Sequence, residues 1–176
     1  MLPDDFRDAL IALLEAEADA VLVGGYAVAF HGHPRATKDL DILVRPSSEN
    51  ALRVYAALVA FGAPLAAVGV GAGDFATPGR VVQIGLPPLR IDIVNQISGV
   101  TFDEAAAQAP RLDVRGHPFR VIGLGALLRN TRAAGRPQDR PAAAPRTNSR
   151  AVCTSATVLP GYTPDANCSE PSKGMV

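Results

Sequence analysis

The stretch Val21–Val44 reads VLVGGYAVAFHGHPRATKDLDILV and decides the fold of this chain. Its first residues, Val21-Leu22-Val23, predict a buried strand, and the glycines that follow mark a turn into a helix that extends to about His31. At the other end, Asp39 and Asp41 open a second apolar run. Because side chains alternate along a strand, both carboxylates leave the same face. Two carboxylates held side by side indicate a site for cations.

The two glycines of this stretch, Gly24 and Gly25, point to an anion. They lie where the expected strand turns into the expected helix. Backbone N–H groups at such a turn point outward and favour negatively charged ligands, and glycine places no side chain in the way. On an isolated edge strand the aspartates would simply face solvent. Beside a glycine turn, they are typical of a site for a nucleotide and metal ions.

A third carboxylate lies on a later strand. Two apolar runs, 81–86 and 89–94, predict an antiparallel pair of strands with a tight connection. The isoleucines of the second run share one face, so Asp92 lies on the other face. A carboxylate in so apolar a strand is costly unless something pairs with it. Asp92 is therefore the candidate for a third metal ligand, although an ion pair with Arg90 or Arg80 would also explain it.

The rest of the chain supplies helices, a small hairpin and a glycine-rich loop. Amphipathic spacing and capping signals predict the helices. The expected fold class is therefore two-layer α/β (α+β), with a small mixed sheet that carries the aspartates on one rim and with the helices on one face. The expected helices span 4–18, 47–61, 101–109 and 124–134, the hairpin spans 112–122, and the flexible loop spans 69–78.

Composition limits the classes of protein to consider. The 176 residues, 48% of them hydrophobic, fit one domain with a real core. Lys and Arg number 17 and so do Asp and Glu, so no net charge attracts nucleic acid or a membrane surface. No apolar stretch is long enough to span a bilayer, and the N-terminus is acidic where a signal peptide is basic. The sequence predicts a soluble, cytoplasmic protein without a membrane partner.

The character of the chain changes near its C-terminal end. From Arg140 onward the sequence is rich in Pro, Ala, Ser and Thr and has no apolar periodicity. We therefore expect an ordered domain over 1–139 and a low-complexity, disordered tail over 140–176.

The order of these features resembles a known superfamily. Two glycines after an apolar run, then Asp39-Leu40-Asp41, then Asp92 on a later strand are similar to the nucleotidyltransferases typified by DNA polymerase beta. Longer stretches of the sequence resemble small bacterial stand-alone nucleotidyltransferases related to abortive-infection toxins. These stretches include FATPGRVVQIGLPPLRIDIVNQISGVTF (75–102) and LLRNTRAAGRPQD (127–139). The resemblance covers about 21–139 and implies the nucleotidyltransferase fold.

The resemblance also implies magnesium-dependent chemistry. In the family, the three carboxylates bind two Mg²⁺ ions, for which Mn²⁺ can substitute, and hard oxygen ligands suit both ions. By position, Asp39 and Asp41 would hold the nucleotide-bound ion, and Asp41 and Asp92 would hold the other. Asp92 would also help to deprotonate the acceptor hydroxyl. The residues that would bind the nucleotide are Gly24, Gly25, Arg35, Thr37 and Lys38.

The implied reaction transfers a nucleoside monophosphate from a nucleoside triphosphate to an acceptor hydroxyl and releases pyrophosphate. The acceptor stays open among RNA, particularly a tRNA 3′ end, a small molecule such as an aminoglycoside, and a protein side chain. The rival interpretation is a catalytically impaired protein of the same fold that binds a nucleotide or a cognate antitoxin. One departure favours this rival, because relatives usually have a lysine where Thr131 stands and Arg140-Pro141 interrupts the helix that follows.

Overall fold

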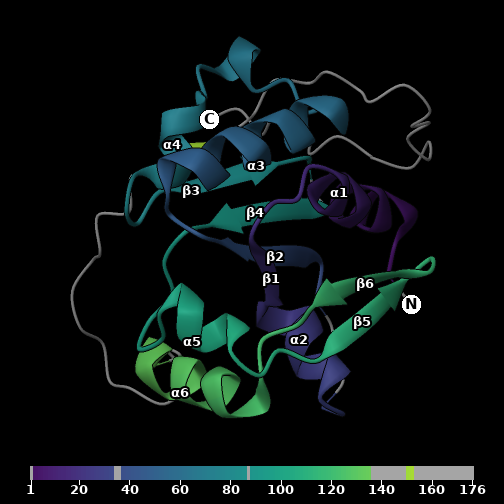
Figure 1. The fold of residues 1–176 in the computed structure, drawn as a ribbon, viewed down its shortest axis with the longest axis vertical. Coiled ribbons are helices and arrows are strands. Elements are labelled where there is room, and N and C mark those ends of the chain that lie inside the picture. The colour runs from purple at the N-terminus through teal and green to yellow at the C-terminus, as the bar shows by residue number, and fades with distance from the viewer. Residues whose placement is uncertain (1, 34–36, 87, 136–149, 153–176) are drawn as a thin grey trace, which may run out of the picture.

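The computed structural model describes residues 2–33, 37–86, 88–135 and the backbone of 150–152. This part of the chain is a mixed α and β protein with a small mixed sheet, as the sequence predicts (Figure 1). Its elements in chain order are α1 (Asp4–Glu15), β1 (Ala20–Val23), α2 (Gly24–Phe30), β2 (Asp39–Val44), α3 (Ser48–Ala60), the 3₁₀ turn η1 (Ala66–Val68), α4 (Ala72–Ala76), β3 (Val81–Ile84), β4 (Arg90–Val94), α5 (Phe102–Ala106), β5 (Arg111–Val114), β6 (His117–Arg120), α6 (Leu124–Ala134) and β7 (Arg150–Val152).

The larger sheet has five strands in the order β1-β2-β4-β3-β7. β1 is antiparallel to β2, and β3 is antiparallel to β4, which confirms the expected pairing of the two apolar runs. β2 is parallel to β4, so the chain must cross over between them, and the crossover contains α3. β7, which the sequence does not predict, pairs in parallel with β3. Apart from β7, the expected tail 140–176 lies outside the described residues.

One face of the sheet is apolar and buried. Ile42, Ile93 and Val82 are neighbours across β2, β4 and β3, and each is at most 1% exposed. They belong to one core cluster with Phe6 of α1 and Val54 of α3. The removal of these side chains from water holds the helical layer against the sheet.

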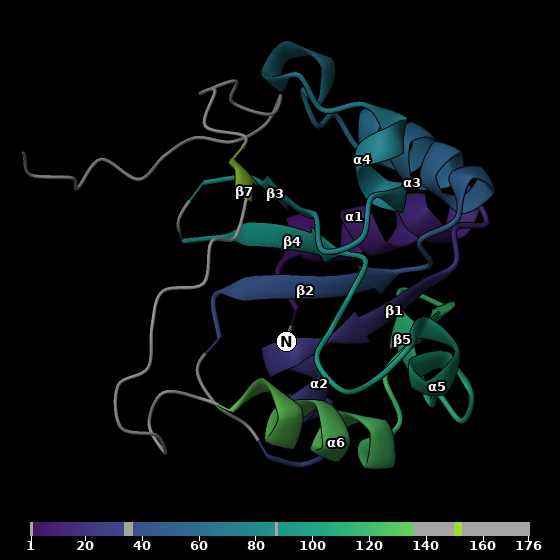
Figure 2. The same cartoon turned by 90° about the vertical axis from the view of Figure 1, so that its left-hand side faces the viewer.

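The helices form two groups along the sheet. α1, α3 and α4 gather beside β3 and β4, whereas α2, α5 and α6 lie toward the β1 edge (Figures 1 and 2). The chain returns to that edge through the hairpin of β5 and β6, whose pairing the sequence predicts correctly. Just after this hairpin, the Ile122 N–H donates to the carbonyl oxygen of Leu22 in β1 (3.0 Å).

Local signals determine several helix ends. Ser47 caps α3, because its side-chain oxygen accepts a hydrogen bond from the N–H of Asn50 (3.2 Å). Thr101 and Glu104 form the expected capping box of α5, and α6 ends at Gly135 in the left-handed conformation. Within the described ranges, no helix is both long enough and apolar enough to cross a membrane.

The expectation of a continuous loop over 69–78 is wrong in part. α4 forms within it, and the Asp74 carboxylate accepts a hydrogen bond from the Gly71 N–H (2.8 Å) at the start of this helix. Phe75 of α4 is 2% exposed and belongs to the core cluster. Burial of one aromatic side chain and one capping contact therefore outweigh the low helix propensity of the glycines.

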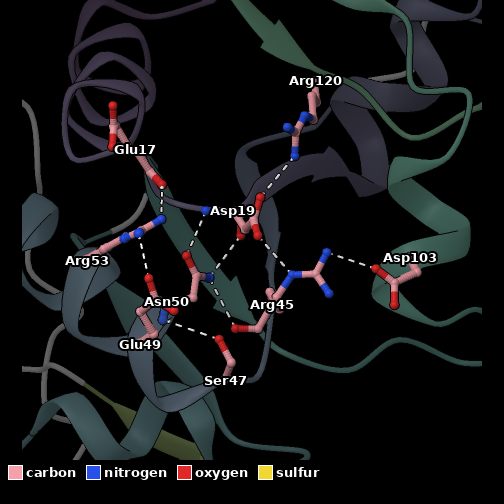
Figure 3. Close-up of polar contacts among 9 residues, drawn as sticks. All are labelled: Glu17, Asp19, Arg45, Ser47, Glu49, Asn50, Arg53, Asp103 and Arg120. Carbon is pink, nitrogen blue, oxygen red and sulfur yellow. Dashed lines mark hydrogen bonds and ion pairs between the residues drawn. The ribbon is translucent and has the colours of Figure 1, made fainter.

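A polar network ties several elements to the start of β1 and the end of β2 (Figure 3). The Asp19 carboxylate accepts hydrogen bonds from Arg45 Nε (2.8 Å) and Arg120 Nη1 (3.2 Å). Arg45 also pairs with Asp103 of α5 (Nη2 to Oδ1, 2.8 Å), and its guanidinium carbon lies 4.5 Å from the ring centre of Phe102. The network therefore fixes the hairpin and α5 at the end of the sheet.

Asn50 is the buried centre of this network, and its replacement should be costly. It is 3% exposed; its Oδ1 accepts from the Asp19 N–H (2.7 Å), and its Nδ2 donates to the carbonyl oxygens of Asp19 (3.0 Å) and Arg45 (3.1 Å). Asn50→Ala should lower the free energy of unfolding in urea by about 3 kcal/mol, because three hydrogen bonds are lost and these part-buried backbone groups lose their partner. Asn130→Ala, which removes one bond to the Ser98 carbonyl oxygen, should cost about 1 kcal/mol or less. Equal losses would contradict the role of Asn50.

Asp19 should make stability depend on pH in the acid range. Burial would raise the pKa of Asp19, but the hydrogen bonds and charges of Arg45 and Arg120 outweigh it, and the net pKa lies below the ordinary 3.8. Its stabilisation is therefore fully present above pH 3.8 and is lost as pH falls through the lower folded pKa. The side chain is 36% exposed, so solvent screening limits this contribution to about 1 kcal/mol. The free-energy difference between the wild type and Asp19→Asn should shrink from pH 7 to pH 2, and a constant difference would contradict this.

Candidate active site

The sheet brings two of the predicted carboxylates together. Asp41 of β2 and Asp92 of β4 are direct partners in the parallel pairing, so their Cα atoms lie about 4.8 Å apart. Partners in register project from the same face of a sheet. Val23, the last residue of β1, pairs with Asp41 from the other side. The glycine turn therefore begins directly beside the carboxylate pair.

The glycines make room for residues of the site itself. Gly24 has φ +64°, and a Cβ atom there would lie 2.0 Å from Asp41 Oδ2. A Cβ atom on Gly25 would lie 2.6 Å from Thr37 Oγ1. The carboxylate of Asp41 and the hydroxyl of Thr37 thus occupy the space that side chains at the turn would fill. This close packing requires glycine at both positions, which the sequence alone did not reveal. It is a different reason for glycine from the predicted approach of phosphates to the backbone.

Asp92 is held in a buried position between two strands. Its side chain is 7% exposed, and its Oδ1 accepts a hydrogen bond from Nε2 of Gln83 (2.8 Å), which is its partner on β3 and is 6% exposed. This amide orients the carboxylate. Gln83 was not predicted as a site residue from the sequence, although a polar residue within the apolar run VVQI was a usable signal. The two ion pairs considered for Asp92 are not formed, because Arg90 pairs with Asp39 and Arg80 pairs with Asp74.

Asp39 has both carboxylate oxygens bonded to Arg90. Arg90 Nε donates to Oδ1 (2.8 Å) and Nη2 donates to Oδ2 (2.6 Å), which is the two-pronged geometry that guanidinium and carboxylate favour. The hydrogen bonds to Asp39 raise the pKa of Arg90 above its ordinary value, burial opposes this, and the charges of Asp39, Asp92 and Asp41 add to it. The Arg90 charge therefore acts on all three carboxylates.

The predicted nucleotide-binding side chains lie just before β2 where they are described. Thr37 is half-buried, and its hydroxyl donates to the backbone carbonyl oxygen of Asp39 (3.2 Å). Lys38 is exposed at the same end of the strand. Arg35 lies outside the described residues. A hydroxyl and an ammonium group therefore lie next to the carboxylates in the chain.

The donor set partly fits a divalent cation. Among the residues that the structure describes, no three His, Cys, Asp or Glu side chains form a group that could hold a metal ion. Asp41 and Asp92 are hard oxygen donors on one face, which suits Mg²⁺, and Gly24 leaves the space that the Asp41 carboxylate needs. Both carboxylate oxygens of Asp39 accept hydrogen bonds from Arg90. The predicted ligands thus fit the ion in kind, and the strand register brings two of the three side by side.

No family model, curated protein or solved structure matches the chain. The resemblance to nucleotidyltransferases therefore rests on the order of the glycine turn and the three aspartates in the sequence.

Proposed function

We propose that this protein is a nucleotidyltransferase that moves a nucleoside monophosphate from a nucleoside triphosphate to an acceptor hydroxyl, with release of pyrophosphate. The observation that carries the proposal is the register of Asp41 and Asp92 on neighbouring parallel strands, directly beside the Gly24 turn. A surface carboxylate pair without function needs neither the buried Asp92 nor the close approach of Asp41 to a glycine. The same arrangement supports assignment of the chain to the nucleotidyltransferase fold.

The three carboxylates have distinct tasks in this proposal. Asp41 and Asp92 would hold a divalent ion between them, and Asp39 would complete a second position. Bound Mg²⁺, or Mn²⁺ in its place, supplies positive charge to the triphosphate and to the attacking oxygen. Gln83 keeps the buried Asp92 carboxylate in one orientation, which suits a group that accepts a proton from the acceptor hydroxyl.

The turn and the segment before β2 form the side of the site for the phosphates. Lys38 is exposed and carries a positive charge next to Asp39, which suits the leaving pyrophosphate. Gly25 and Thr37 lie against each other and keep the turn close to this segment. Arg35 is included on its position in the sequence alone.

The second candidate function is nucleotide or partner binding without catalysis, for example as one component of a toxin–antitoxin pair. One observation favours it: Arg90 engages both oxygens of Asp39, so one expected metal ligand is already paired with a cation inside the protein. Such a protein would keep the fold and the glycine turn but would not assemble both metal positions.

Pyrophosphate release separates these two functions. Each radiolabelled nucleoside triphosphate is incubated with the protein and Mg²⁺, with total RNA or a set of aminoglycosides as acceptor. Labelled product and free pyrophosphate that disappear with a chelator support the transferase. Stabilisation of the protein by a nucleoside triphosphate, without turnover on any acceptor, supports the binding protein. If the protein shows no turnover and is not stabilised by any nucleoside triphosphate, both candidate functions are contradicted.

A further inference from the structure

We propose that Gln83 of β3 is a positioning residue of the site: its amide holds one carboxylate oxygen of Asp92 and so leaves the other, Oδ2, to receive the proton of the acceptor hydroxyl. This role rests on the proposed function and deepens it, because it assigns the atom that takes up the proton. It does not depend on how Asp39 and Asp41 are paired.

The first support is that Gln83 and Asp92 form a polar pair in an apolar ladder. The other pairs in the register of β3 with β4 are Val81 with Val94, Val82 with Ile93 and Ile84 with Ile91. Gln83 and Asp92 are 6% and 7% exposed. Replacement of both members of a buried polar pair by apolar groups of the same shape is often neutral or stabilising. The stability of the sheet therefore does not explain why this pair is polar.

The second support is the geometry of the hydrogen bond. An ionised carboxylate can only accept, so the Gln83 amide must turn its nitrogen toward Asp92, and Nε2 donates to Oδ1 (2.8 Å). Hydrogen bonds to a charged group are stronger than those between neutral groups, above all where water is excluded. Rotation of the carboxylate would break this contact. Within the described part of the chain, no hydrogen bond or ion pair is formed by Oδ2 of Asp92.

The orientation of Oδ2 matters at one step of the proposed reaction. The O–H bond of the acceptor breaks and its proton passes to Oδ2, the acceptor oxygen bonds to the α-phosphorus, and pyrophosphate leaves with the electron pair of the broken P–O bond. This proton transfer needs the hydroxyl within hydrogen-bond reach of Oδ2. A carboxylate that rotates freely would meet this geometry for only part of the time. Loss of the Gln83 donor should therefore slow the transfer step rather than weaken nucleotide binding.

The test is a double-mutant cycle on kcat, with Mg²⁺, radiolabelled nucleoside triphosphates, and total RNA or a set of aminoglycosides as acceptor. Gln83→Met, which has nearly the shape of glutamine but cannot donate, should lower kcat about 10- to 100-fold and leave KM for the triphosphate unchanged. In the Asp92→Asn background the same change should lower kcat by less than about two-fold, because an asparagine side chain takes up no proton in any orientation.

Asn95→Ala is the matched control. Asn95 is a second buried polar residue, just beyond the end of β4, and is 5% exposed. Among the described residues, its side chain bonds to the backbone of Phe75, Thr77 and Gly79. Its loss should lower stability and leave kcat per folded molecule unchanged. A fall in kcat as large as that of Gln83→Met would assign the effect to a loosened sheet and overturn the role of Gln83.

A second readout needs no activity. Without metal or nucleotide, Gln83→Met should lower the melting temperature by about 5 °C in the wild-type background. It should lower the melting temperature less in the Asp92→Asn background, because a neutral side chain suffers less than a buried charge from loss of the donor. If Gln83→Met does not fold, Gln83→Asn, which draws the amide back by one carbon, takes its place in both cycles.

Each outcome supports or overturns the role of Gln83. Wild-type kcat in a folded Gln83 variant, or losses that add in either cycle, would overturn this role and leave the proposed transferase standing. Absence of transfer by the wild type to both acceptor sets would overturn the proposed function and this role with it.

Discussion

Replacement of Asp92 by asparagine should lower nucleotidyl transfer on the order of 10³-fold while the fold stays intact, because a charge that stabilises the transition state is lost from a preorganised site. Asparagine keeps the shape of the side chain, and its Oδ1 can still accept the hydrogen bond that Gln83 donates to Asp92. The measurement is labelled product formed per unit time, with circular dichroism to verify the fold.

The same variant should be more stable than the wild type when no metal is present. Asp92 is 7% exposed and lies beside Asp41 in register, so its charge is repelled by a neighbour in a poorly solvated place. Removal of that charge should raise the melting temperature in chelator by about 3 °C and abolish the further increase that Mg²⁺ with a nucleotide gives the wild type. Asp113→Asn, at an exposed position of β5, should change neither activity nor melting temperature. A variant of Asp92 that keeps full activity would exclude the proposed site.

Gly24→Ala should impair both folding and activity. The residue has φ +64°, which an L-amino acid with a side chain adopts at a cost, and the added carbon would lie 2.0 Å from Asp41 Oδ2. Together, strain and overpacking should lower the free energy of unfolding by about 3 kcal/mol. The carboxylate of Asp41 must move to relieve the contact, so the folded fraction should also transfer poorly. Urea unfolding and product formation per folded molecule measure the two effects separately.

Gly69→Ala is the matched control for this experiment. Gly69 has a similar φ of +71°, but nothing lies within 4 Å of an added carbon there. It should therefore show only the backbone cost, about 1–2 kcal/mol, and no loss of activity per folded molecule. If both variants lose the same stability and keep the same activity, the close packing of Asp41 on the turn has no functional role.

Most of the elements and the pairing of β3 with β4 could be predicted from the sequence, because local signals determine them. Alternating apolar residues define β2 and β4, and caps at Ser47 and Thr101 define α3 and α5. α4 could not be predicted in this way. Its glycines disfavour a helix, and the burial of Phe75 that compensates depends on the tertiary structure.

For the candidate site, the sequence predicts which face of its own strand each aspartate occupies, but not how the strands are aligned with one another. The alternation of residues places Asp39 and Asp41 on one face of β2, but it says nothing about which residues of β4 lie opposite them. That register pairs Asp41 with Asp92 and leaves Asp39 opposite Arg90. The sequence alone therefore could not show which two carboxylates are neighbours and which one faces a guanidinium. The resemblance to nucleotidyltransferases stays a prediction.

The parallel pairing of β2 with β4 would also determine when, during folding, a cation can first bind at the proposed site. Asp39 and Arg90 are 51 positions apart in the chain, so joining these strands closes a long loop and is entropically expensive. Such distant contacts form late compared with local helices. The proposed metal ligands on β2 and β4 are therefore not yet side by side in a partly folded chain. Binding of a divalent ion would therefore indicate that the central sheet has formed, and a collapsed folding intermediate would not bind the metal.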